Sequence, residues 1–158
     1  MEFKVRRSGH IVIRVADVAR SARFFTDVLG LTIIGNTDRQ MYFLTADFEA
    51  NHHMVLVRPA KPGAAQPDPD RRIGLAQAAF EVGSLSDLKA LYARLRAAGA
   101  TIERSEDRGA IKALFARDPD GNLFEFYCRE GGGTPKLADR YRVRGSIDHL
   151  LAPAPASA

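Results

Sequence analysis

The sequence predicts an α+β fold made of two β-α-β-β-β modules that face each other across a central cleft, with the helices outside. The first observation is a repeated pattern, because residues 9–17 and residues 75–84 each read as a strand that leads into a helix. Val15 and Val82 hold equivalent places in the two copies, at an offset of 67 (82 − 15). The second observation is that short strands follow each helix. We therefore expect the functional site between the two copies.

Module one is predicted to span residues 8–58. Residues 10–15 carry the β-branched side chains typical of a strand, and Asp17 offers an N-cap for the helix that follows. The apolar residues of that helix share one face, and Gly30 comes after it, where a left-handed residue commonly ends a helix. Three short strands separated by polar turns complete the module, at residues 31–35, 41–45 and 53–57.

Residues 59–74 contain four prolines and little periodic apolar content, so they are predicted to form a linker. Module two then spans residues 75–129 and repeats the order of elements. A strand at residues 76–82 leads to Ser84, the N-cap of a second helix, which Gly99 ends. The strands that follow are predicted at residues 101–103, 111–116 and 123–128.

We expect residues 1–133 to form a single domain and residues 134–158 to form a C-terminal tail. Within this tail, residues 147–151 are apolar enough to add either a short helix or a dimer contact. The start of the chain lacks the long apolar stretch of a signal peptide, and no window reaches the length of a membrane span.

Composition places the chain in the ordinary range of soluble proteins, with 46% hydrophobic and 27% charged residues. The net charge is +4, but basic and acidic residues are interspersed, which argues against a nucleic-acid partner. Cys128 is the only cysteine, so an intramolecular disulfide is excluded and a cytoplasmic location is favoured. It reads as either a small buried residue or a reactive thiol.

Side chains alternate across a strand, so each predicted strand has a face toward the helix and a face away from it. The face away from the helix carries His10 and Gln77, which share the offset of 67 (77 − 10), and Glu125 in the last strand. Imidazole and carboxylate suit Fe²⁺, Mn²⁺, Zn²⁺ or Ni²⁺, and an amide oxygen is a weaker third ligand. The alternative is that these are solvent-facing residues of a half-exposed sheet.

Two stretches carry a family resemblance, residues 9–31 and the segment 118–126, which reads DPDGNLFEF. They resemble the vicinal oxygen chelate superfamily of glyoxalase I, type I extradiol dioxygenases, bleomycin and fosfomycin resistance proteins and methylmalonyl-CoA epimerase. The resemblance covers about residues 8–129 and is nearest, by local motif, to the extradiol dioxygenases. It implies two modules that pair into a curved mixed sheet around a divalent metal ion, and a homodimer.

Carried over by motif, the resemblance implies that His10, Gln77 and Glu125 bind the metal, with Fe²⁺ or Mn²⁺ favoured and Zn²⁺ or Ni²⁺ possible. It implies that His53 is the catalytic acid/base, although His53 could equally be a histidine exposed in a turn. The implied substrate pocket is lined by Val12, Phe115 and Tyr127.

The sequence departs from the family pattern at three places. Gln77 stands where the dioxygenases have a second histidine, and Phe115 stands where they usually have a tyrosine. Glyoxalase I commonly has a further carboxylate in module one, and aligning Asn51 with Asn122 puts Met54 opposite Glu125, at an offset of 71 (125 − 54). A four-ligand glyoxalase site is therefore incomplete.

Three functions follow from the resemblance. The first is a metal-dependent enzyme that acts on a small substrate with vicinal oxygens, with catechol ring cleavage as one example. The second is a metal-free protein that binds a small molecule, as the bleomycin resistance proteins do. The third is a glyoxalase-like lyase or isomerase. No membrane or nucleic-acid partner is expected for any of them.

Overall fold

The structure is a computed structural model, and it describes residues 9–37, 41–46, 55–61, 63–64, 74–131 and 142–151. Contacts divide the chain into two compact units, Met1–Ala65 and Gln66–Ala158. Each unit contains one of the predicted modules. In the part of the chain that the structure describes, no helix is both long enough and apolar enough to cross a membrane.

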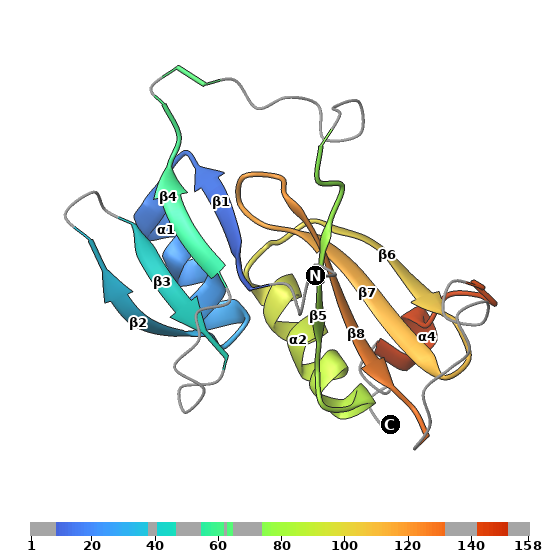
Figure 1. Ribbon diagram of the computed structural model, residues 1–158. Coiled ribbons are helices and arrows are strands. Elements are labelled where there is room, and N and C mark those ends of the chain that lie inside the picture. The colour runs from blue at the N-terminus through green and yellow to red at the C-terminus, as the bar shows by residue number, and fades with distance from the viewer. Residues whose placement is uncertain are drawn as a thin grey trace, which may run out of the picture. The chain divides into compact units, whose positions relative to one another are not determined.

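Module one contains one sheet with a helix against it (Figure 1). Its sheet has the strand order β1-β4-β3-β2, in which β1 and β4 are parallel and the other pairs are antiparallel. A π-helical turn, η1, continues α1 without a break. The elements are β1 (Ile11–Val15), α1 (Val18–Arg23), η1 (Phe24–Val28), β2 (Thr32–Asn36), β3 (Tyr42–Thr45) and β4 (Val55–Pro59).

Module two repeats this arrangement, with the strand order β5-β8-β7-β6 and a parallel pair of β5 and β8. The predicted α+β fold of two β-α-β-β-β modules is therefore confirmed. The predicted short helix in the C-terminal tail is also present, as α4. The elements are β5 (Ala78–Glu81), α2 (Leu85–Ala97), β6 (Ile102–Asp107), β7 (Ile111–Arg117), β8 (Leu123–Arg129) and α4 (Asp148–Leu151).

Both principal helices begin at the predicted N-caps. The Asp17 side chain accepts a hydrogen bond from the backbone N–H of Arg20 at 2.9 Å, and the Ser84 hydroxyl accepts one from the backbone N–H of Asp87 at 3.1 Å. Asp17 and Ser84 are also 67 residues apart (84 − 17), which agrees with the offset seen in the strands before them. Gly30 follows the first helix at φ 73°, the left-handed conformation that favours glycine.

The register of the parallel strands corrects one alignment between the modules. Ile11 pairs with Val55 in module one, and Ala78 pairs with Phe124 in module two. The last strands therefore correspond at an offset of 69 (124 − 55), and not 71. By this register Glu125 is equivalent to Leu56 (125 − 56), so module one still has no carboxylate at the equivalent position.

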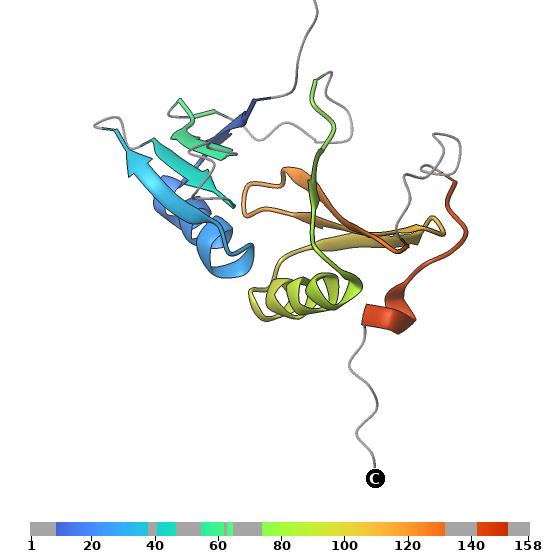
Figure 2. The same cartoon turned by 60° about the horizontal axis from the view of Figure 1, so that its bottom comes forward.

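The predicted division of each strand into two faces is confirmed. In β1, Ile13 and Val15 are buried, whereas Val12 is 47% exposed. In β8, Phe124 and Phe126 are buried toward α2. Phe124 stacks on Phe80 of β5 at a ring-centroid distance of 5.6 Å, and Phe126 contacts the same ring at a tilt, at 6.0 Å. Figure 2 shows α2 lying along one face of the module-two sheet. The other face is the non-helical face, and it carries the polar residues of interest.

Cys128 lies on the helix face of β8 and is fully buried. Burial raises the pKa of its thiol above the ordinary value, so the reactive thiolate is disfavoured. These observations support the interpretation of Cys128 as a small core residue.

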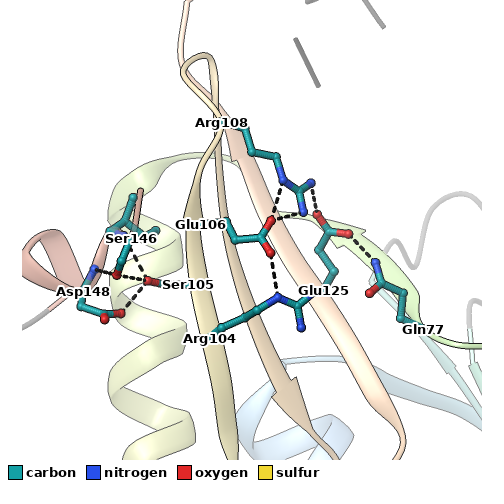
Figure 3. A network of polar contacts seen from close by, with 9 residues as sticks. Gln77, Arg104, Ser105, Glu106, Arg108, Glu125, Ser146 and Asp148 are labelled. Atoms are coloured by element: carbon teal, nitrogen blue, oxygen red, sulfur yellow. Dashed lines mark hydrogen bonds and ion pairs between the residues drawn. The ribbon is translucent and has the colours of Figure 1, made fainter. Parts of the chain in front are cut away.

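Strand β6 extends four residues beyond its predicted end and binds the C-terminal segment 142–151. The Ser105 hydroxyl donates to an Asp148 carboxylate oxygen at 2.5 Å and accepts from the backbone N–H of Ile147 at 3.1 Å. Gly145 forms a β-bridge with Asp107, and Ile147 is fully buried. This segment therefore packs on the helix side of module two, on the opposite side of β6 from the non-helical face (Figure 3).

Replacing Ser105 with alanine should release the C-terminal segment locally. The change removes the acceptor for the Ile147 N–H and the donor to Asp148, which costs about 1–2 kcal/mol. Hydrogen exchange should become faster at residues 145–151 and stay unchanged in β7 and β8. Equal protection of this segment in wild type and variant would contradict the role assigned to Ser105.

Candidate ligand site on the non-helical face of module two

Module two brings Gln77 and Glu125 together, as the sequence predicted. Gln77 lies directly before β5, and Glu125 lies in the middle of β8. The Gln77 amide nitrogen Nε2 donates to Glu125 Oε2 at 2.7 Å. Ala79 of β5 pairs with Glu125, so Gln77 and Glu125 project from the same face of the sheet. The amide of Gln77 thus meets the carboxylate as a hydrogen-bond donor.

The second oxygen of Glu125 is bound by a residue that the sequence did not suggest. Arg108 Nη1 donates to Glu125 Oε1 at 2.8 Å, and Arg108 Nε donates to Glu106 Oε2 at 2.8 Å. Arg104 Nε then donates to Glu106 Oε1 at 2.7 Å. We call these five residues, Gln77, Arg104, Glu106, Arg108 and Glu125, the charged cluster (Figure 3).

The pairing of β6, β7 and β8 explains why this cluster forms. Arg104 pairs with Phe115, and Phe115 pairs with Glu125, so the three form a row across the sheet. Arg104 and Glu106 are two residues apart in β6 and therefore project from the same face. An irregularity in register between Ile102 and Arg104 sets which face that is. Arg108 follows Glu106 at the same spacing of two residues, just beyond the end of β6.

Phe115 forms the floor beneath Arg104. Its side chain is fully buried, and the Arg104 guanidinium carbon lies 3.6 Å from the ring centroid. This distance is typical of a guanidinium stacked flat on an aromatic ring. The predicted pocket residue Phe115 is therefore covered by Arg104, and the guanidinium forms the surface above it.

The charged cluster is electrically neutral, because two guanidinium groups balance two carboxylates. The side chains of Arg108 and Glu125 are each only 9% exposed, so their attraction is weakly screened by water. Burial raises the pKa of Glu106, but hydrogen bonds from Arg104 and Arg108 outweigh it and hold the pKa below the ordinary value. Burial likewise lowers the pKa of Arg108, and its bonds to Glu106 and Glu125 raise it overall.

The lowered pKa of Glu106 predicts a pH dependence of stability. A carboxylate with a depressed pKa in the folded state stabilises the fold above its unfolded pKa, and this contribution is lost as pH falls through the folded pKa. Wild type should therefore exceed Glu106→Gln in free energy of unfolding at pH 7, and the difference should shrink as pH is lowered past 4.5, the ordinary value. Urea denaturation of both proteins between pH 7 and pH 3 measures this. A constant difference would argue against an ionised, paired Glu106.

The remaining predicted site residues are His10 and Val12 in module one, Tyr127 in module two, and His53. His10 is exposed and immediately precedes β1, in the compact unit that does not contain Glu125. Val12 is exposed on the non-helical face of β1. The Tyr127 hydroxyl donates to Glu81 at 3.1 Å. His53 lies outside the described residues.

A divalent metal ion does not fit the charged cluster as it stands. Both oxygens of Glu125 already accept hydrogen bonds, and the guanidinium of Arg108 in contact with it repels a cation. Gln77 directs a donor, not its oxygen, toward this carboxylate. Among the described residues, no three side chains of His, Cys, Asp or Glu gather into a group that could hold an ion.

Comparison with known families agrees with the paired-module fold. Residues 7–126 match the model of the Glyoxalase/Bleomycin resistance protein/Dioxygenase superfamily. The chain belongs to this superfamily. In a domain of the same superfamily from Frankia sp. EAN1pec, the solved structure superposes with a TM-score of 0.69 at 24% identity, over 82% of this chain and 96% of that one.

Curated members of the superfamily extend the comparison to enzymes. The chain is 33% identical over 135 residues to biphenyl-2,3-diol 1,2-dioxygenase 3 of Rhodococcus globerulus, covering 85% of this chain and 69% of that protein. It is 28% identical over 132 residues to a manganese-dependent 2,3-dihydroxybiphenyl 1,2-dioxygenase of Geobacillus genomosp. 3, covering 80% of this chain and only 38% of that protein. These relatives are dioxygenases by name, and the name of one states that it depends on manganese.

Sequence reasoning missed Arg104, Glu106 and Arg108. The spacing of two between these charged residues is a strand signal, because it places all three on one face. The sequence-based prediction ended this strand at residue 103, whereas β6 runs to Asp107. The pairing of Arg108 with Glu125 could be found only from the register of β6 against β7 and β8.

Proposed function

We propose that this superfamily member binds a small organic molecule on the non-helical face of module two without a metal ion held by Glu125. The observation that carries the proposal is the ion pair between Arg108 and Glu125. It gives the carboxylate its counter-charge from within the chain. The predicted ligand set is further weakened by Gln77, whose amide is a poorer ligand than imidazole for a transition metal.

Separating Arg108 from Glu125 would cost free energy. An ion at Glu125 would have to separate a buried ion pair, which leaves Arg108 with fewer partners in a region of low dielectric. It would also come within a few ångströms of a fixed positive charge. Metal binding at this carboxylate therefore starts from a penalty that an unpaired glutamate does not have.

Metal analysis of the protein purified without chelator tests the proposal. We expect fewer than about one ion of iron, manganese or zinc per ten chains, because Arg108 already neutralises the ionised carboxylate of Glu125. Addition of EDTA should leave thermal stability unchanged. Stoichiometric metal that is lost in both His10→Ala and Glu125→Ala would overturn the proposal and establish a metal site.

The second candidate is a metal-dependent enzyme of the dioxygenase type, and the 33% identity to a biphenyl-2,3-diol dioxygenase favours it. In that case His10 and Glu125 would hold Fe²⁺ or Mn²⁺ with Gln77 as a third contact, and His53 would move protons. Ring cleavage of biphenyl-2,3-diol by protein supplied with Fe²⁺ or Mn²⁺ distinguishes the candidates. If turnover occurs, His53→Ala should slow it by about 10²-fold with metal content unchanged.

The homodimer implied by the family resemblance stays a prediction for either candidate. Sedimentation equilibrium of the full chain checks it, with a mass near twice 17.3 kDa expected. A single species at the monomer mass would contradict it.

A further inference from the structure

We propose that Arg104 recognises the anionic end of the ligand and selects small carboxylates over neutral molecules of the same shape. The inference rests on the proposed function, since it places the ligand on the same sheet face. It adds the chemical class of ligand and the residue that selects it.

The position of Arg104 is fixed by two contacts. Phe115 lies under its guanidinium at 3.6 Å, and Glu106 accepts from its Nε at 2.7 Å. The side chain nevertheless remains 45% exposed, although Phe115 beneath it is fully buried. The guanidinium is thus held flat against the sheet while part of it stays open to solvent.

The terminal amino groups of Arg104 are the unused part of the charged cluster. Within the described ranges, Arg104 donates only through Nε, and only to Glu106. Arg108, by contrast, donates hydrogen bonds to both Glu106 and Glu125, and its side chain is 9% exposed. Arg117 and Arg129 each have a carboxylate partner as well, Glu103 and Glu81. Arg104 therefore presents donors that no described residue accepts.

A carboxylate is the group that best matches these donors. The guanidinium edge offers two parallel N–H groups, which fit the two oxygens of a carboxylate. Because Phe115 and Glu106 already restrict the rotamers of Arg104, binding loses little side-chain entropy. The negative charge of Glu106 is already balanced by Arg104 and Arg108 together, so a ligand anion at the outer edge of Arg104 would not meet an unpaired carboxylate.

Benzoate and its neutral isostere benzamide serve as probes, and EDTA is present throughout. We expect benzoate to shift the NMR signal of the Arg104 Nε–H saturably and to bind at least about tenfold more tightly than benzamide, as a charge-assisted hydrogen bond predicts. Arg104→Gln should weaken benzoate binding by about tenfold or more and benzamide binding hardly at all. Arg104→Lys should give an intermediate loss, because it keeps the charge without the planar fork.

The matched control is Arg94→Gln, which removes the same charge from the exposed surface of α2 on the helix side of the sheet. This variant should bind benzoate as wild type does. Three results would overturn the inference: equal affinity for the two probes, wild-type affinity in Arg104→Gln, or no saturable response to benzoate. If Arg104→Gln fails to fold, Arg104→Lys provides the test: an intermediate loss of benzoate affinity is expected, and wild-type affinity would overturn the inference.

The outcome is independent of the metal question, because the chelator removes metal from every arm. Discovery of a resident ion would overturn the proposed function. The preference for benzoate over benzamide would still be decided by the binding measurements alone. Loss of that preference in a metal-free protein would overturn only the role of Arg104.

Discussion

Replacing Arg108 with methionine is expected to lower the free energy of unfolding at pH 7 by about 3–5 kcal/mol. The variant keeps an unbranched apolar side chain in place of the arginine stem but leaves the carboxylate of Glu125 without its counter-charge. Glu125 is buried, so water cannot replace the lost guanidinium at low cost. Glu106 loses one of its two arginine partners at the same time.

Urea denaturation of wild type and Arg108→Met measures this effect. The matched control is Arg129→Met, which breaks an ion pair with Glu81 whose side chains are 38% and 44% exposed. Exposed pairs contribute about 0–1 kcal/mol, so the control should lose much less stability than Arg108→Met. Equal losses in the two variants would show that the buried ion pair contributes no more to the free energy of unfolding than the exposed pair does.

The second large effect is the creation of a metal site. Combining Gln77→His with Arg108→Gln should raise the affinity for Mn²⁺ or Zn²⁺ by about 100-fold over wild type, since a single charge about 6 Å from a divalent ion contributes near 3 kcal/mol at an effective dielectric of about 40. The imidazole adds a better ligand than the amide that it replaces. Calorimetric titration of the folded variant measures the gain.

Gln77→His alone is the informative control for this experiment. It supplies the imidazole but keeps Arg108 on Glu125, so we expect only a small gain in affinity. If Gln77→His alone reached the affinity of the double variant, Arg108 would not be the group that opposes the metal. That result would return the second candidate function to first place.

Much of the fold could be predicted from the sequence because the two modules repeat the same local signals. The N-caps Asp17 and Ser84 and the alternating strand faces depend on neighbouring residues only, and these predictions agree with the structure. The association of Gln77 with Glu125 was also predictable. Side chains alternate between the two faces of a strand, and this alternation places both residues on the same face of two neighbouring parallel strands.

The chemistry at Glu125 could not be predicted in the same way. Its partner Arg108 lies 17 residues away (125 − 108) and reaches it only across the β6–β7 hairpin. A shift in register between Ile102 and Arg104 sets the face on which Arg104 and Glu106 project. No local sequence signal predicts this shift. Sequence motifs therefore identified Glu125 as a candidate metal ligand. The pairing of strands far apart in the sequence determined that Arg108 binds its carboxylate.

The similarity to proteins named dioxygenases is compatible with this interpretation. A superfamily fold can keep its modules and the carboxylate of the last strand while the groups around that carboxylate change. Here a glutamine and an arginine surround Glu125, and an arginine covers Phe115. On the function proposed above, these groups would favour an anionic organic molecule over a cation.

Titration of metal-free wild type with Mn²⁺, beside Glu125→Gln, tests the central claim most directly. If Arg108 already neutralises Glu125, the two proteins should bind the ion equally weakly, with dissociation constants of about 10⁻³ M or higher, at or beyond the weak end of protein cation sites. Stoichiometric micromolar binding by wild type that disappears in Glu125→Gln would contradict the claim, because that carboxylate would then be free to hold a metal ion.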